Sequence, residues 1–208
     1  RVAAGAAGAA GGAAAKGKGK AAAGAKGKGK DGKPAPAPKK KGAAPARMDV
    51  SAVDIRVGTI VEVKKHPDAD ALYVEKIDVG EEEPRTIVSG LVKHKTEAQM
   101  LNARVLVLAN IKTSKMRGIP SQGMVLCASS GETVDFVVPP EGVANGERVA
   151  FAGFEGEPDE VLNPKKKQWD AVQPELKTNT AGVAQYQGVD FGTSKGPCKS
   201  AVAEGSIR

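Results

Sequence analysis

Apolar and polar residues alternate from residue 54 onward with the period of two that is typical of half-buried strands. Ile55, Val57, Thr59, Val61 and Val63 occupy alternate positions of the first run, which ends at the turn sequence 66–68. Further apolar runs bounded by turn formers predict strands over residues 72–79, 85–89, 103–111, 124–128 and 134–138. Residues 96–101 predict one short helix. The pattern therefore predicts a mainly β protein.

The order of these elements narrows the fold. Three strands, a short helix and at least two more strands fit a five-stranded Greek-key barrel of the oligonucleotide-binding type, although the periodicity fits other small barrels as well. The 161 residues that follow residue 47 suffice for one domain, or for one domain with a small appendage.

Residues 1–47 differ sharply from the rest. They are almost entirely Ala, Gly, Lys and Pro, a composition that cannot build a core, so we expect a disordered basic linker. This segment holds 12 Lys or Arg and one acid, and residues 48–208 hold 19 Lys or Arg against 23 acids. The net charge of residues 1–47 is thus +11, and that of residues 48–208 is −4. A site for an anion in residues 48–208 must therefore be a local basic patch. The tail itself either binds phosphates non-specifically or serves as a solubilising linker. Because the first residue is Arg1, we expect the chain to be a fragment or a processed product.

A local basic patch does occur, between residues 93 and 117. It contains Lys93, Lys95, Arg104, Lys112, Lys115 and Arg117 against the single acid Glu97. Its centre, residues 112–124, lies between two predicted strands and mixes cations with glycines and with the polar side chains of Ser121 and Gln122. These are groups that contact phosphate oxygens. Local composition leaves two interpretations open: a loop that holds a phosphate backbone, or an ordinary solvated basic hairpin.

Other chemistries find less support. His66 and His94 lack a partnered carboxylate and nucleophile, and a loop-fixing role in the turn explains His66. Asp68 and Asp70 are open to two interpretations, a weak cation site or a turn. No hydrolase or nucleotide-loop motif is present, so we expect no catalytic residues, no metal and no cofactor. The two cysteines indicate a reduced, intracellular protein, with a disulfide between them left open. No apolar run approaches the length of a membrane span.

Several separated motifs, in order, resemble the tRNA-binding domain typified by endothelial monocyte-activating polypeptide II. They are the segments 66–74, 88–91, 115–118, 121–124 and 125–130. A second block, over residues 156–169, resembles the C-terminal extension of the eukaryotic branch. The likeness covers residues 48–208 and leaves out the tail.

The resemblance implies an oligonucleotide-binding domain over 48–150 and, over 151–208, a small C-terminal subdomain that mimics the dimer partner of bacterial relatives. The chain would then be monomeric. The family's RNA-binding motif falls on residues 115–124, just after Asn110 and Lys112. Together with the basic patch, it predicts a tRNA site formed by Lys93, Lys95, Asn110, Lys112, Lys115, Met116, Arg117, Ser121 and Gln122.

The predicted function is that of a non-catalytic, cytoplasmic tRNA-binding module. Its partners would be tRNA and an aminoacyl-tRNA synthetase, in cis as the C-terminal part of methionyl-tRNA synthetase or in trans. The alternative is a free synthetase-complex cofactor with a cytokine-like signalling role, for which residues 56–61 match a proposed signal segment. With 3% aromatic residues, contacts should favour phosphates and folded shape over base stacking. Trp169 beside Lys165, Lys166 and Lys167 is open to two interpretations, a second RNA contact or an anchor for the C-terminal part.

Overall fold

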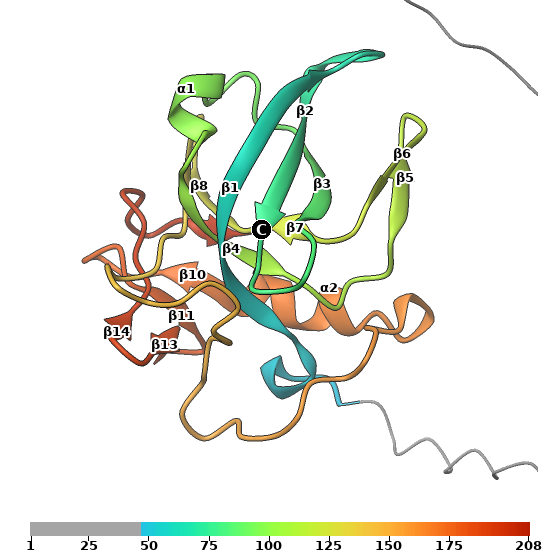
Figure 1. Ribbon diagram of the computed structural model, residues 1–208. Coiled ribbons are helices and arrows are strands. Elements are labelled where there is room, and N and C mark those ends of the chain that lie inside the picture. Colours follow the sequence, from blue (N-terminus) through green and yellow to red (C-terminus); the bar gives the residue numbers. More distant parts are fainter. Residues whose placement is uncertain (1–46) are drawn as a thin grey trace, which may run out of the picture. The chain divides into compact units, whose positions relative to one another are not determined.

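The segments with alternating side chains form a five-stranded antiparallel sheet in the computed structural model, which describes residues 47–208 (Figure 1). The tail predicted to be disordered lies outside the described residues except for Arg47. The strand order is β3-β2-β1-β4-β7. The strands are β1 (Ile55–His66), β2 (Ala69–Asp78), β3 (Arg85–Ser89), β4 (Arg104–Leu108) and β7 (Met124–Val125). The strands predicted over 72–79, 85–89 and 103–111 are thus present as β2, β3 and β4, and residues 56–61 lie within β1.

The alternation of buried and exposed side chains along β1 differs from the prediction in the second half of the strand. The pairing of β1 with β2 shifts register between Ile60 and Glu62, which inserts one extra residue into β1. Such a bulge exchanges the two faces of the strand beyond it. Val61 occupies the extra position and is 44% exposed, so it departs from the alternation of the run. Ile60 precedes the bulge and is buried in a second core cluster with Val105 and Val107.

A six-stranded sheet joins the middle of the chain to its C-terminal part, in the order β12-β11-β10-β15-β8-β9. Its strands are β8 (Cys127–Ser130), β9 (Thr133–Phe136), β10 (Leu176–Thr178), β11 (Ala184–Tyr186), β12 (Val189–Asp190) and β15 (Ser206–Ile207). The predicted single strand 124–128 is in fact β7 followed by β8, because the chain changes sheets at the buried Leu126. The division at residue 150 stays a prediction; β8 pairs with β15 across it.

Short elements complete the described chain. The helical ones are η1 (Val50–Ala52), α1 (Glu97–Met100), η2 (Pro164–Lys166), α2 (Gln168–Val172) and η3 (Gln173–Glu175). Two small ribbons are β5 (Ser114–Met116) with β6 (Ile119–Ser121), and β13 (Gly192–Thr193) with β14 (Gly196–Pro197). The predicted helix 96–101 is confirmed as α1, which begins with a capping box between Thr96 and Gln99. None of the helices in residues 47–208 has the length and hydropathy to cross a bilayer.

The two edges of the five-stranded sheet approach each other without a strand ladder between them. The Gln122 N–H donates to Thr86 O at 2.8 Å, and the Thr86 N–H donates to Gln122 Oε1 at 2.9 Å. The Val88 N–H donates to Ser121 Oγ at 3.0 Å. These bonds satisfy the exposed edge of β3. The mainly β prediction is confirmed, and the sheet is bridged at this seam by one backbone hydrogen bond and two hydrogen bonds to side chains.

Candidate nucleic-acid interface

The β5–β6 ribbon carries the cations of the predicted loop away from both sheets (Figure 1). Lys112 lies just before β5, Lys115 lies within it, and Arg117 lies at the turn; all three side chains are exposed. Within residues 47–208 none of the three forms an ion pair or a side-chain hydrogen bond. Their charges are therefore free to meet an anion.

The turn of the ribbon fixes where Arg117 lies. Met116 pairs with Ile119, which leaves Arg117 and Gly118 as a two-residue loop, and both have positive φ, 48° and 92°. A two-residue hairpin of this kind matches the twist of its strands but favours Asn or Gly at the first position. Arg117 thus occupies a backbone conformation that its residue type rarely adopts, and this places a guanidinium at the tip.

A second hairpin tip supports the ribbon. The buried imidazole of His66, at the end of β1, lies with Nε2 3.2 Å from Met116 O, and its Nδ1 accepts the Asp68 N–H at 3.0 Å. The loop-fixing role predicted for His66 agrees with this geometry, which also extends to the ribbon. Lys65, next to His66 and exposed, is a cation that the sequence reasoning missed, and the Lys64-Lys65 doublet was its only signal.

Three predicted site residues use their side chains to hold the fold together, and of these Gln122 is exposed. Asn110 is 5% exposed; its Nδ2 donates to Ala52 O and Asp159 O, and its Oδ1 accepts the Asp54 N–H. Ser121 is buried and Gln122 bridges to Thr86, as described above. These side chains position the strands around the ribbon.

The remaining cations of the predicted basic patch differ in whether the fold already supplies them with a partner. Lys93 is exposed, whereas Lys95 is 18% exposed, lies 2.6 Å from Asp135 Oδ1 and has its Nζ 5.3 Å from the centroid of the Phe136 ring. Arg104, counted in the basic patch, donates to Val143 O at 2.5 Å. The patch of six cations is therefore reduced to Lys93 and the three on the ribbon.

A cleft of about 400 Å³, the Met116 cleft, separates the ribbon from the loop that follows β3. Ser114, Met116 and Ser121 line one side, and Ser89, Gly90, Leu91 and His94 line the other. The cleft therefore brings two of the motifs in the family resemblance face to face, with Lys93 beside it in the chain. Met116 contributes an apolar wall here.

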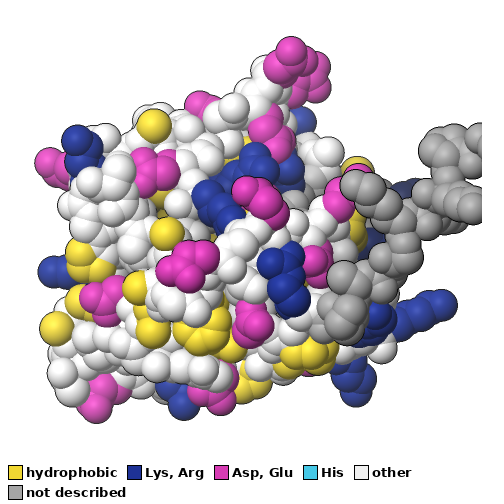
Figure 2. All heavy atoms as spheres, turned by 90° about the horizontal axis from the view of Figure 1, so that it is seen from below, with side chains coloured by type: hydrophobic (Ala, Val, Ile, Leu, Met, Phe, Trp, Pro, Cys, Tyr) yellow, Lys and Arg dark blue, Asp and Glu magenta, His cyan; other side chains and the backbone are white. Residues whose placement is uncertain are grey.

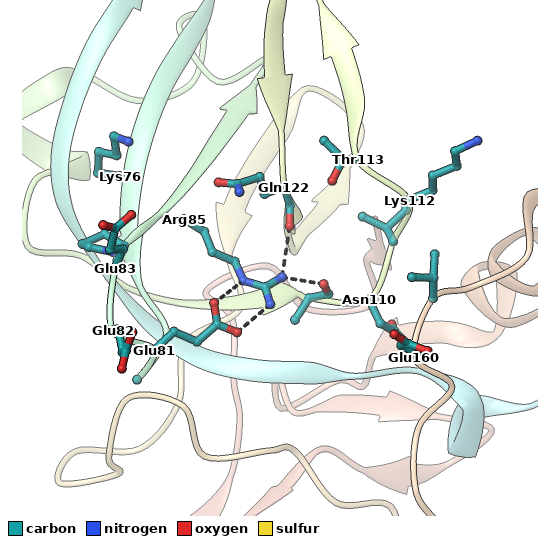
Figure 3. A pocket seen from close by; sticks show the side chains of 15 residues that line it. Lys76, Glu81, Glu82, Glu83, Arg85, Asn110, Lys112, Thr113, Gln122 and Glu160 are labelled. Atoms are coloured by element: carbon teal, nitrogen blue, oxygen red, sulfur yellow. Dashed lines mark hydrogen bonds and ion pairs between the residues drawn. The ribbon is translucent and has the colours of Figure 1, made fainter. Parts of the chain in front are cut away.

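A larger hollow, of about 1200 Å³, has a different character (Figure 3). At its centre the Arg85 guanidinium donates to both carboxylate oxygens of Glu81, to Ala109 O and to Gln122 O. Glu82, Glu83 and Glu160 also line it. Lys112 points away from this cluster in Figure 3. The acids make the interior of this hollow a poor match for a polyanion.

Charge on the face seen in Figure 2 is likewise mixed, with acidic and basic side chains interspersed. No cluster of three or more His, Cys, Asp or Glu suited to a metal ion occurs in residues 47–208. Cys127 and Cys198 are buried and free, and burial raises the pKa of both thiols to about 12. Neither thiol is a nucleophile at neutral pH.

Comparisons with known proteins agree with this geometry. Residues 55–148 match the family model described as "Putative tRNA binding domain". The aminoacyl tRNA synthase complex-interacting multifunctional protein 1 of Cricetulus griseus is 53% identical over 165 residues, which are 77% of this chain and 46% of that protein. The cytoplasmic methionine–tRNA ligase of Arabidopsis thaliana is 54% identical over 169 residues, 80% of this chain and 21% of the ligase.

A solved structure extends the similarity to the C-terminal part. The C-terminal domain of Plasmodium vivax p43 superposes with a TM-score of 0.75 at 40% identity, covering 78% of this chain and all of that domain. The chain spans about half the length, or less, of the curated relatives described above.

Proposed function

The chain belongs to the family of tRNA-binding domains, and from that premise we propose that it is a non-catalytic module that holds tRNA for an aminoacyl-tRNA synthetase. The observation that carries the proposal is the β5–β6 ribbon, where Lys112, Lys115 and Arg117 are exposed and unpaired within residues 47–208. The rest of the folded part has an excess of acids, so the ribbon is a local basic surface on an acidic domain.

Binding rests on the phosphate backbone. The ribbon cations contact phosphates, and the turn at Arg117 and Gly118 holds the guanidinium at the tip, where the RNA backbone can approach. Lys93 adds a contact across the Met116 cleft. Asn110, Ser121 and Gln122 act by holding the ribbon and its surroundings in place. Contacts of this kind carry little sequence information, so different tRNAs should bind alike.

The wider assignments rest on the same family. The seam at Gln122 and Thr86 supports an oligonucleotide-binding barrel over 48–150, and the pairing of β8 with β15 supports a subdomain over 151–208 that occupies the place of a dimer partner and leaves the chain monomeric. The identity with the plant ligase supports a cytoplasmic methionyl-tRNA synthetase as the body to which the module is joined. Tethering tRNA would raise its effective concentration at that enzyme.

Measuring the affinity for unfractionated tRNA at several salt concentrations tests the proposal. Lys115→Ala/Arg117→Ala should reduce the slope of log K against log salt by about 2, because two phosphate contacts are lost. Near physiological salt the affinity should fall about thirtyfold.

The matched control removes two lysines on elements that lie apart from the β5–β6 ribbon in Figure 1. Lys177 on β10 and Lys195 between β13 and β14 are exposed, and Lys177→Ala/Lys195→Ala changes the net charge equally. Equal losses in the two double variants would show that net charge, and not the ribbon, governs binding. An unchanged affinity in the ribbon variant would remove the ribbon from the site.

A further inference from the structure

A third hollow lies on the other side of the ribbon, where its root meets the C-terminal part. This Trp169 hollow has a volume of about 510 Å³. One wall is the connection from β4 into β5, residues 111–114, and the other is formed by residues 162–164 and 167–170 of η2, α2 and the chain leading into them. Figure 1 shows the β4–β5 connection passing beside α2. The size lies within the range of about 300–1000 Å³ typical of small-ligand sites.

The two walls are fixed to each other by hydrogen bonds. The Leu162 N–H donates to Asn110 O at 2.8 Å, which ties the second wall to the end of β4. Gln168, 1% exposed, donates to Asp159 Oδ2 and Arg47 O and accepts the Asn163 N–H at 2.6 Å. The hollow is therefore formed before any ligand arrives, which lowers the entropic cost of binding.

The chemistry of the lining combines an aromatic surface with cations. Trp169 is partly buried against the main core and still lines the hollow, next to Ile111, Leu162 and Pro164. Lys112 and Lys167 line it as well, and Asp170 is the one acid among its lining residues. The anchoring and the binding interpretations of Trp169 are thus compatible.

Two further features raise the local positive charge. Lys165 and Lys166 lie on η2 between the lining residues Pro164 and Lys167, and they are exposed and unpaired within residues 47–208. Lys167 has φ 53°, a left-handed conformation that is uncommon for a residue other than glycine and often marks a functional position. Lys112 belongs both to this hollow and to the ribbon, so the two surfaces are continuous.

We propose that the Trp169 hollow binds one unpaired nucleotide of the RNA, with its base on the indole and its phosphates on Lys112 and Lys167. The proposal rests on the tRNA-binding function and extends it, because an aromatic face beside cations binds single-stranded nucleotides, whose bases are free to stack. A duplex keeps its bases paired and would not enter. The site would thus favour tRNA regions with unstacked bases.

Because Trp169 is the single tryptophan of the chain, its fluorescence reports directly on this hollow. Titrating the full chain with a short oligoadenylate and with tRNA should quench the emission to saturation. A blunt RNA duplex of the same length should leave it nearly unchanged. Lys112→Ala/Lys167→Gly should weaken the oligoadenylate titration about tenfold, as expected for two lost contacts to a single strand. Glycine at 167 keeps the left-handed backbone, so the variant should stay folded.

Lys177→Ala/Lys195→Ala again serves as the charge-matched control and should titrate like the parent chain. Binding of tRNA without any change in Trp169 emission would overturn this inference and leave the proposed function standing. Equal quenching by the duplex, or unchanged quenching in Lys112→Ala/Lys167→Gly, would also overturn it. Failure of tRNA itself to bind would overturn both proposals, and would be seen independently in the salt titration.

Discussion

The five-stranded sheet and the β5–β6 ribbon both carry ionisable side chains, but they place them in opposite surroundings. In the sheet, Glu75 points from β2 into the interior and is 0% exposed, with Ser89 Oγ donating to its carboxylate. Arg85 at the edge is surrounded by acceptors. On the ribbon, Lys115 and Arg117 are exposed, and neither forms an ion pair among the described residues.

The difference separates charges that belong to the fold from charges that remain free for a ligand. The Arg85 guanidinium uses four of its five N–H donors on carboxylate and carbonyl oxygens, which leaves a single donor for a phosphate. An exposed guanidinium such as that of Arg117 contributes little to stability and retains its full capacity to bind. Counting cations along the sequence cannot make this distinction, because it depends on which acceptors the fold brings near.

The largest effect on the free energy of unfolding should come from the buried Glu75. Burial raises the pKa of its carboxyl from 4.5 to about 7. Between these values the unfolded chain releases the proton and the folded chain keeps it, so stability falls as the pH rises through this window and is constant above it. The full loss amounts to about 3 kcal/mol. Urea unfolding of the parent and of Glu75→Gln at pH 5 and pH 8 measures it.

Glu75→Gln removes the charge and keeps the shape, so the variant should match the parent near pH 5 and exceed it at pH 8. The difference between the two proteins cancels the contributions of other carboxyl groups. Parallel stability curves across this range would mean that Glu75 is ionised in the fold at little cost. Affinity for tRNA at fixed pH should be the same in both proteins, because Glu75 is 0% exposed and cannot contact the RNA.

Replacing Asn110 should have the second largest effect on stability, since its side chain is bonded within the fold although the residue belongs to the predicted tRNA site. Asn110→Ala leaves the buried Asp54 N–H and the Asp159 carbonyl without their partner, which costs about 2 kcal/mol. The Ala52 carbonyl loses one bond and keeps the one from the Asp159 N–H. Urea unfolding measures this loss, and tRNA binding is compared under conditions where the variant is fully folded. A variant of parental stability with lost affinity would contradict the positioning role and indicate direct contact with RNA.

Much of this architecture follows from the sequence. The period-two alternation locates β1 to β3, and Thr96 with Gln99 marks the start of α1. The bulge after Ile60 could not be predicted, because it depends on pairing with β2 and not on the local pattern of β1. The change of sheets at Leu126 could not be predicted for a similar reason. Leu126 is buried, and its sequence context does not differ from that of a buried residue inside a continuous strand.

The candidate site shows the same limit. Local sequence indicated the loop, its cations and its glycines, since these depend on neighbouring residues. It could not show that Asn110 faces Ala52 and Asp159, or that the ribbon root lies against Trp169. These contacts join segments about 50 residues or more apart, and only the folded arrangement brings them together.

The smallest effects separate two predicted site residues that are two positions apart. Lys95 is paired with Asp135 and lies over Phe136, whereas Lys93 is exposed and unpaired within residues 47–208. Lys95→Ala should therefore cost about 1 kcal/mol of stability and change tRNA affinity little. Lys93→Ala should lower the affinity about fivefold near physiological salt, as expected for one phosphate contact, with a stability change below about 0.5 kcal/mol. Salt-dependent tRNA titrations and urea unfolding of both variants give the two readouts. The reverse pattern, in which Lys95→Ala lowers the salt slope and Lys93→Ala does not, would show that RNA displaces Asp135 and that a paired cation can still serve the site.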